Sequence, residues 1–399
     1  MIELTDLLAT SGGFVHGPVF ASRFLAFSYD TRLLTPAGAA DALAPIFVAV
    51  KTEKGDGHDF IGDAVARGAS AVLCQQPVDL AAAGVTCLVV PDTRTALTAY
   101  ARHALQRPGL TTVGITGSTG KTTAKELIAA VLGSGGQAVF HNRGSINGRY
   151  GLSIAAGELE PYHRLAVLEL AADSFDEIRD LAELTRPQVG VLTAINEAHL
   201  ATFGSLAAIA AEKGRLLEVL PPEGLAVLNA DDPHTLALSA RTQAHCVTVG
   251  LSPHADLRAD DVTVTSKGLL FRISDSRDWL KDRQSGTGYD RFSMTIRSNL
   301  LGRHLIPLLL AAVAVGRWFG VPDAEIAAVL EHFEPLPGHL RPLPGRHGAL
   351  IMDDTVNASP AATTAALEVL TLFTEHPRIA VLGDMWEVSG HGGPRVSMV

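Results

Sequence analysis

The sequence predicts an α/β protein built on a mainly parallel sheet, and three observations support this class. Short apolar runs alternate with helical patterns along most of the chain, and a β-branched run at 111–116 leads through glycines into a helix-forming run at 124–132. Such alternation is typical of parallel strands joined by helices that cover both faces of a sheet. The third observation is size: 399 residues, 47% hydrophobic and 19% charged, suffice for two or three packed domains.

Composition excludes several classes of protein. A net charge of −10 argues against a general nucleic-acid binder, because phosphate affinity needs concentrated Lys and Arg. The longest apolar run, Leu305 to Val315, is too short to span a bilayer and contains Pro307. No charged-then-apolar leader opens the sequence, so we expect a cytoplasmic protein without membrane insertion. Three widely spaced cysteines fit reduced core thiols better than disulfides or a zinc site: Cys74, Cys87 and Cys246.

The segment 111–123 predicts a phosphate-binding loop, because a strand, a glycine turn and a helix start follow one another directly. Lys121 would supply a point charge, and Thr122 would offer its hydroxyl to a Mg²⁺ carried by the nucleotide. The strict spacing places a glycine where this chain has Ile115, so Gly114 and Gly117 are the candidates for that glycine. The alternative interpretation is a glycine-rich turn with a solvated lysine. Phosphate contacts are expected from Gly117, Ser118, Thr119, Gly120, Lys121, Thr122 and Thr123.

Before this loop, short strands alternate with helical patterns. Strands are expected at 46–50, 71–74 and 87–90, and a helix at 60–67. Two polar clusters, at 28–32 and 55–58, interrupt the pattern, and their spacing alone favours ordinary turns. Pro108 and Gly109 then indicate a domain boundary.

After the loop, polar residues follow or interrupt two apolar strands. The strand at 165–170 carries Glu169, and the strand at 189–193 is followed by Asn196 and His199. Ligands of open parallel sheets bind at the carboxyl ends of strands, and an acid within an apolar strand is costly unless it is paired or bound to a metal. His199 alone would more often be a capping or surface residue. Helices are expected at 207–220 and at 305–319. The first carries Lys213, for which the alternative interpretation is an ordinary solvated lysine.

The C-terminal region predicts one β-α-β unit. A strand beginning near His347 ends in Asp353 and Asp354, a helix follows at 361–373, and a second strand at 378–383. Residues 391–399 show no periodicity. We therefore expect an incomplete C-terminal domain.

Six motifs in this order resemble those of the Mur ligase family. They lie at Thr116–Thr122, Glu169–Leu170, Asn196–His199 with Phe203–Ser205, Ala210–Gly214, Leu228–Pro233 and Asp353–Pro360. The resemblance covers nearly the whole chain. It implies a three-domain architecture: an N-terminal UDP-substrate-binding domain at 1–106, a central ATP-binding domain at 107–335, and a Rossmann-like C-terminal domain at 336–399, truncated here.

The resemblance is greatest to the branch that adds D-alanyl-D-alanine to UDP-N-acetylmuramoyl tripeptide. It implies that ATP phosphorylates the peptide carboxylate and that the dipeptide amine attacks the acyl phosphate. Lys121 would hold the β- and γ-phosphates, Thr122 and Glu169 one Mg²⁺, and His199 a second. Asn147 would lie near the transferred phosphate, Lys213 would carry a carbamate, and Asp354 would hold the ATP ribose. The implied uridine-nucleotide contacts are Ser28, Thr31, Arg32, Asp56, Gly57 and His58. The protein is expected to act as a monomer.

Four residues depart from the family pattern. Leu305 and Leu308 stand where relatives carry asparagines, the first of which reads adenine. Val356 replaces a tyrosine, and His339 replaces a hinge arginine. With the short C-terminal domain, these departures leave two other readings open. One is a non-catalytic nucleotide-binding remnant, and the other is a family ligase with a different amine acceptor.

Overall fold

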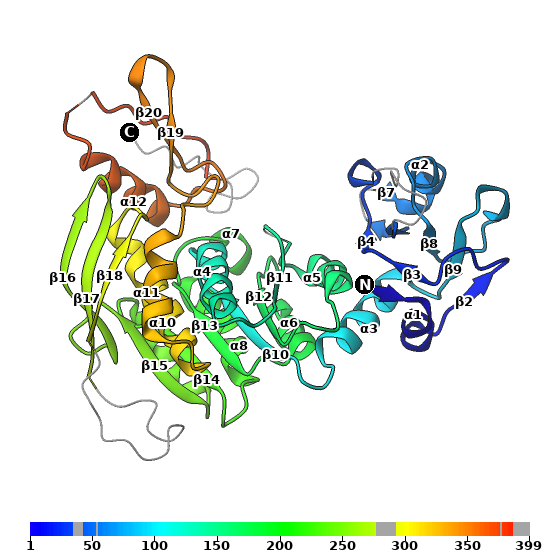
Figure 1. The fold of residues 1–399 in the computed structure, drawn as a ribbon, viewed down its shortest axis with the longest axis horizontal. Coiled ribbons are helices and arrows are strands. Elements are labelled where there is room, and N and C mark those ends of the chain that lie inside the picture. The colour runs from blue at the N-terminus through cyan, green and yellow to red at the C-terminus, as the bar shows by residue number, and fades with distance from the viewer. Residues whose placement is uncertain (35–42, 53–54, 145, 277–292, 376, 386–399) are drawn as a thin grey trace. The chain divides into compact units, whose positions relative to one another are not determined.

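A computed structural model describes residues 1–34, 43–52, 55–144, 146–276, 293–375 and 377–385. The chain divides into two compact units. The first comprises residues 1–110 and 142–164, and the second comprises 111–141 and 165–399 (Figure 1). The chain passes between the units near 110, close to the boundary expected at Pro108 and Gly109, and twice more near 141 and 164. The expected division into three domains stays a prediction.

The first unit is built on a five-stranded sheet in the order β2-β9-β8-β5-β4. The strands β4, β5, β8 and β9 are parallel, and β2 pairs antiparallel with β9. The strands are β2 (Phe14–His16), β4 (Phe27–Ser28), β5 (Ile46–Val48), β8 (Ala71–Cys74) and β9 (Thr86–Val89). The apolar runs expected near residues 46, 71 and 87 therefore form the buried centre of this sheet, because both faces are covered.

Short elements complete the first unit. Two antiparallel pairs join β1 (Ile2–Glu3) to β3 (Arg23–Phe24) and β6 (Lys51–Thr52) to β7 (Gly55–Asp56). The helices are α1 (Leu4–Ser11), α2 (Ile61–Ala66), α3 (Thr93–Leu105) and α5 (Arg149–Ala155). Asp92 begins α3 by accepting the Thr95 amide at 2.7 Å. The buried side of the segment at 142–164 packs against the N-terminal strands, where Gly157 leaves room for Phe27 and Ile2.

The second unit contains a nine-stranded sheet in the order β11-β12-β10-β13-β14-β15-β16-β17-β18. Neighbours from β11 to β16 are parallel, whereas β17 is antiparallel to both β16 and β18. The strands are β10 (Thr111–Thr116), β11 (Val139–His141), β12 (Leu165–Glu169), β13 (Val189–Leu192), β14 (Leu225–Asn229), β15 (His245–Gly250), β16 (Leu257–Thr265), β17 (Gly268–Asp275) and β18 (Ser293–Ser298). A mainly parallel sheet is confirmed.

Helices pack on this sheet in two groups. The helices α4 (Lys121–Ser134), α10 (Ile306–Trp318) and α11 (Asp323–His332) pack together over the larger core, whose members include Leu127, Val131 and Leu309. The helices α6 (Glu177–Thr185) and α8 (Leu206–Glu218) form the second group. The short helices α7 (Leu200–Phe203) and α9 (Pro233–Ala237) also pack against α8. Pro307 lies at the start of α10, where a missing amide hydrogen costs little.

The C-terminal region differs from the expected β-α-β unit. The strand β20 (Leu350–Asp353) pairs antiparallel with β19 (Arg341–Pro344), and α12 (Pro360–Thr371) follows. The strand expected at 378–383 is wrong: these residues form no strand, and Ile379 and Val381 are 81% and 94% exposed. An apolar run becomes a strand only when a neighbour accepts its backbone hydrogen bonds, and β20 pairs with β19 instead.

Candidate active site

The phosphate loop follows β10 and ends where α4 begins. Gly117 has φ +155° and Gly120 φ +80°, a region that strongly favours glycine. A Cβ at Gly117 would collide with the Thr193 hydroxyl, and one at Gly120 would lie 3.0 Å from Leu308. Gly114 instead lies within β10, paired with Leu168 and Gly190. The turn glycine is therefore Gly117, and Ile115 remains a buried strand residue.

The loop after β13 braces the phosphate loop. The Ser118 amide donates to the Ala194 carbonyl at 2.6 Å, and the Thr193 hydroxyl donates to the Thr119 carbonyl at 2.6 Å. The Asn196 side-chain amide donates to the Thr119 hydroxyl at 3.0 Å. These bonds fix the loop through the protein's own groups, which lowers the entropic cost of phosphate binding. The sequence analysis did not select Thr193 as a site residue, although a polar residue at the end of a buried strand could have indicated one.

Two predicted metal ligands meet at the start of α4. The Thr122 hydroxyl donates to Glu169 Oε2 at 2.9 Å, and Glu169 is 1% exposed. The side chain of Lys121 lies over the loop, with Nζ donating to the Ser118 carbonyl at 3.2 Å. Mg²⁺ in nucleotide sites is held by one or two protein oxygens plus phosphates. A hydroxyl and a carboxylate in contact fit that ion. Within the described residues no cluster of three His, Cys, Asp or Glu side chains forms a metal site.

His199 lies at the same edge of the sheet as Glu169. Its Nδ1 is 3.6 Å from Oδ1 of Asp173, which follows the end of β12 by four residues. His199 precedes α7 with φ +64°, a conformation uncommon for residues with a side chain. Asp173 is another residue that the sequence analysis missed. An exposed acid in a loop carries no signal until the fold brings it to a histidine.

Three other predicted residues lie in different places. Lys213 is buried in α8, with 1% of its surface exposed, so the interpretation as a solvated lysine is wrong. Asn147 belongs to the first unit, because the segment 142–164 packs there. Asp354 follows β20 and accepts the Leu340 amide at 3.2 Å, beside the hinge residue His339. Their roles in carbamate formation, phosphate binding and ribose binding stay predictions.

The six residues predicted to bind a uridine nucleotide form two connected turns in the first unit. The Thr31 hydroxyl bonds to Asp63 of α2, and α2 directly follows the 3₁₀ turn 57–60. Gly57 donates to the Val50 carbonyl at 2.9 Å, and a Cβ there would lie 2.6 Å from the Val50 nitrogen. This close approach requires glycine. The two polar clusters are therefore brought together around α2.

Both ring nitrogens of His58 are engaged within the protein. Nδ1 lies 2.6 Å from Oδ1 of Asp56, and Nε2 is 2.9 Å from the Gln75 amide. Because the amide can only donate, Nε2 accepts and Nδ1 carries the hydrogen that goes to Asp56. His58 thus ties the turn to the end of β8. This geometry assigns it a role in shaping the turn.

Arg32 is held by an acid that the sequence analysis did not select. Its guanidinium forms a forked pair with Asp30, with Nη2 to Oδ2 at 2.6 Å and Nε to Oδ1 at 2.9 Å. Hydrogen bonds from Arg32 lower the pKa of Asp30 to about 2. Asp30 also accepts the Arg32 amide, and Ser28 donates to the Asp30 carbonyl at 3.1 Å. Asp30 therefore holds Arg32 in a defined orientation, with 83% of the Arg32 side chain exposed to solvent.

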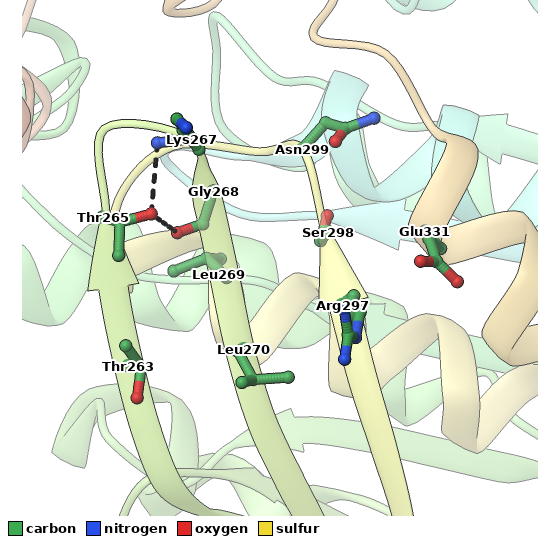
Figure 2. Close-up of a pocket in the computed structure, with 10 residues that line it drawn as sticks. All are labelled: Thr263, Thr265, Lys267, Gly268, Leu269, Leu270, Arg297, Ser298, Asn299 and Glu331. Atoms are coloured by element: carbon green, nitrogen blue, oxygen red, sulfur yellow. Dashed lines mark hydrogen bonds between the residues drawn. The ribbon is translucent and has the colours of Figure 1, made fainter.

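A separate cavity of about 390 Å³ lies at the antiparallel end of the large sheet. Figure 2 shows Thr263 and Thr265 on β16, Leu270 on β17, Arg297 on β18 and Glu331 on the neighbouring helix α11. Five strand spacings separate β10 from β17, about 24 Å. None of the phosphate-loop residues lines this cavity. The candidate catalytic residues, in the phosphate loop and at Glu169, therefore lie outside this cavity.

Comparison with known proteins places this geometry in a family. Residues 115–316 match the Mur ligase middle domain, and residues 40–104 match the catalytic domain of the Mur ligase family. A relative from Escherichia coli, UDP-N-acetylmuramoyl-tripeptide--D-alanyl-D-alanine ligase, is 35% identical over 91% of this chain and 75% of its own length. The chain belongs to the Mur ligase family.

Solved structures of Mur ligases share this fold. MurF from Acinetobacter baumannii superposes with a TM-score of 0.81 at 26% identity, covering 97% of this chain and 80% of that one. MurF ligase from Thermotoga maritima in complex with ADP gives a TM-score of 0.69 at 26% identity, covering 87% and 75%. Among the residues that the structure describes, no helix is long and apolar enough to cross a membrane.

Proposed function

We propose that the chain is an ATP-dependent ligase that joins D-alanyl-D-alanine to UDP-N-acetylmuramoyl tripeptide during peptidoglycan synthesis. The observation that carries the proposal is the contact between Thr122 and Glu169 beside a braced glycine loop. The named E. coli relative, 35% identical, supports the choice of substrates. The MurF–ADP complex supports an adenine nucleotide as the phosphoryl donor.

The residues of the second unit fit the phosphoryl-transfer step. The ammonium of Lys121 and the amides at the start of α4 would neutralise the β- and γ-phosphates, where negative charge develops during transfer. Thr122 and Glu169 would hold Mg²⁺, which draws charge from the phosphate oxygens. His199 is proposed to face the same phosphates. Its imidazole is a poorer ligand for Mg²⁺ than an oxygen, so the Thr122–Glu169 pair is the stronger candidate for the metal.

The amide-forming step needs the other predicted residues. The peptide carboxylate attacks the γ-phosphorus of ATP, giving an acyl phosphate and ADP. The amine of the dipeptide then attacks the acyl carbon, phosphate leaves, and the amine loses a proton. A carbamate on Lys213 would supply an anion within a buried helix face, and Asn147 and Asp354 would contact the phosphate and the ribose. The turns around Arg32 and Asp56 would hold the uridine diphosphate. We propose that the protein acts in the cytoplasm, where ATP and UDP-linked precursors occur, and we keep the expectation that it acts as a monomer.

The decisive experiment measures phosphate release from ATP with Mg²⁺, UDP-N-acetylmuramoyl tripeptide and D-alanyl-D-alanine. Release is expected only when both acceptor substrates are present, and mass spectrometry should show the pentapeptide product. The Lys121→Ala variant is the control for background hydrolysis. Binding of ATP or the UDP-substrate by calorimetry without turnover would instead support a non-catalytic remnant. Turnover with a different amine would support another ligase of the family.

A further inference from the structure

The loop between Glu169 and α6 carries a carboxylate to the imidazole of His199. Asp173 Oδ1 lies 3.6 Å from Nδ1, and the side chains are 87% and 15% exposed, respectively. The acid is therefore solvated, while the ring is largely enclosed. A small rotation of the exposed Asp173 side chain would turn this electrostatic contact into a hydrogen bond. Phe175, in the same loop, packs edge-to-face on Phe203 of α7 with centroids 5.0 Å apart.

A buried acid on another helix fixes this loop. Glu212 of α8 is 3% exposed, and each of its carboxylate oxygens accepts a backbone amide at 2.8 Å, from Asp176 and Ile178. These amides open α6, where a helix favours negative charge. Glu177 then accepts the Asp173 amide at 3.0 Å. The position of Asp173 therefore depends on Glu212, which directly precedes Lys213 in α8.

We propose that Asp173 is a positioning residue for His199, and that Glu212 holds the loop that makes this possible. A carboxylate at Nδ1 favours the tautomer in which Nδ1 carries the hydrogen. Nε2 then keeps its lone pair. The importance of this tautomer for catalysis depends on the proposed ligase function, whereas the tautomer itself does not.

The first test is nuclear magnetic resonance of the full chain labelled with ¹⁵N-histidine, at about pH 8, where an ordinary imidazole is neutral. Long-range ¹H–¹⁵N spectra report which ring nitrogen carries the hydrogen, and the His199→Gln variant assigns the signal. We expect hydrogen on Nδ1 in the parent and on Nε2 in Asp173→Ala. The control is Glu197→Ala, which removes a carboxylate two residues from His199 and should leave the tautomer unchanged. An unchanged tautomer in Asp173→Ala would overturn the proposal.

The Glu212 variants test the second link. Glu212→Ala leaves two amides of α6 without their carboxylate and should shift the His199 tautomer as Asp173→Ala does. Glu212→Gln keeps one acceptor and should restore part of the parent signal. If Glu212→Ala stays folded by circular dichroism yet shows the parent tautomer, the Glu212 link is wrong.

A double-mutant cycle connects the geometry to turnover. Asp173→Ala should lower kcat about 10- to 100-fold with little change in the KM for ATP. In the His199→Gln background the same change should have almost no further effect, because Asp173 acts through the imidazole. Additive losses would show that Asp173 acts elsewhere and would overturn its assignment. Absence of turnover in the parent would count against the ligase function, while the tautomer measurement would still decide the positioning role.

Discussion

Thr122 and Glu169, 47 residues apart in the chain, meet through a hydrogen bond of 2.9 Å at the start of α4. One lies in the first turn of the helix, and the other ends the neighbouring strand β12. Glu169 lies opposite Ile115 in the parallel register, so the sheet itself brings the carboxylate to the phosphate loop. A buried carboxylate with a hydroxyl partner is a costly arrangement that a metal-bound nucleotide would stabilise further.

Replacing Glu169 by Gln should lower kcat at least about 100-fold, because it removes the charge proposed to hold the metal. Thr122→Val should have a similar effect, whereas Thr122→Ser keeps the hydroxyl and should keep most activity. Phosphate release at increasing Mg²⁺ concentration measures the change. Glu223→Gln, on an exposed turn before β14, is the matched control and should behave like the parent. A Glu169→Gln enzyme with the parent's Mg²⁺ dependence would contradict the assignment.

Gly117→Ala should abolish ATP binding and lower the free energy of unfolding by more than about 2 kcal/mol, since its φ is positive and the new Cβ collides with Thr193. Gly133→Ala is the control. Gly133 lies in the last turn of α4 with open space around it, so alanine should stabilise the protein by up to about 1 kcal/mol. Thermal unfolding and calorimetry with ATP measure both variants. Equal effects of the two substitutions would show that the loop tolerates a side chain at position 117.

The thiols of Cys74 and Cys87 should resist alkylation in the native protein. Burial, together with the neighbouring Cys87, raises the pKa of the Cys74 thiol to about 12, and the two sulfur atoms lie 3.7 Å apart on adjacent strands. The reactive thiolate of Cys74 is therefore scarce at neutral pH, and burial shields the Cys87 thiol from the reagent. Half-buried Cys246 should react first, and all three should react in guanidinium. Rapid labelling of Cys74 in the folded protein, located by mass spectrometry, would contradict this.

Asp354→Asn should stabilise the protein slightly at neutral pH, by less than about 1 kcal/mol. Burial raises the pKa of Asp354 above its usual 3.8. A raised carboxyl pKa contributes stability below the unfolded pKa, and this contribution is lost as the pH rises through the folded pKa. The gain from asparagine should therefore be present at pH 7 and vanish below about pH 4. Melting curves across this range test the sign, and a gain that grows on acidification would refute it. The proposed ribose contact predicts a higher KM for ATP in the same variant.

Sequence reasoning predicted those elements in which local pattern and tertiary environment agree. The strands at Leu165 and Val189 are continuous apolar runs because both faces of the sheet are covered. The helix at Leu309 is apolar because it is buried in the core over that sheet. The run at Ile379 is equally apolar, but a strand also needs a pairing partner, which a local pattern does not report. This is why that prediction failed.

The site was predicted in part for the same reason. Lys121 and Thr122 directly follow a glycine-rich turn, and Glu169 is a charged residue within an apolar strand. These local contrasts allowed the sequence analysis to select them. Asp173 and Glu212 could not, because an acid in a loop or on a helix resembles a solvated side chain. Their importance comes from contacts between elements, with His199 and with the start of α6.

The polypeptide passes between its two units at residues 110, 141 and 164. Cutting the gene at any one of these points would separate strands β10 and β11 from their neighbours, or separate the 142–164 segment from the first unit, against which it packs. Strands β11 (Val139–His141) and β12 are adjacent and parallel, so the end of β11 and the start of β12 lie at opposite edges of the sheet. The second unit alone would therefore need a new crossover connection in place of the 142–164 segment. Producing either unit alone therefore requires a new connection between its two chain segments, because a simple truncation does not isolate it.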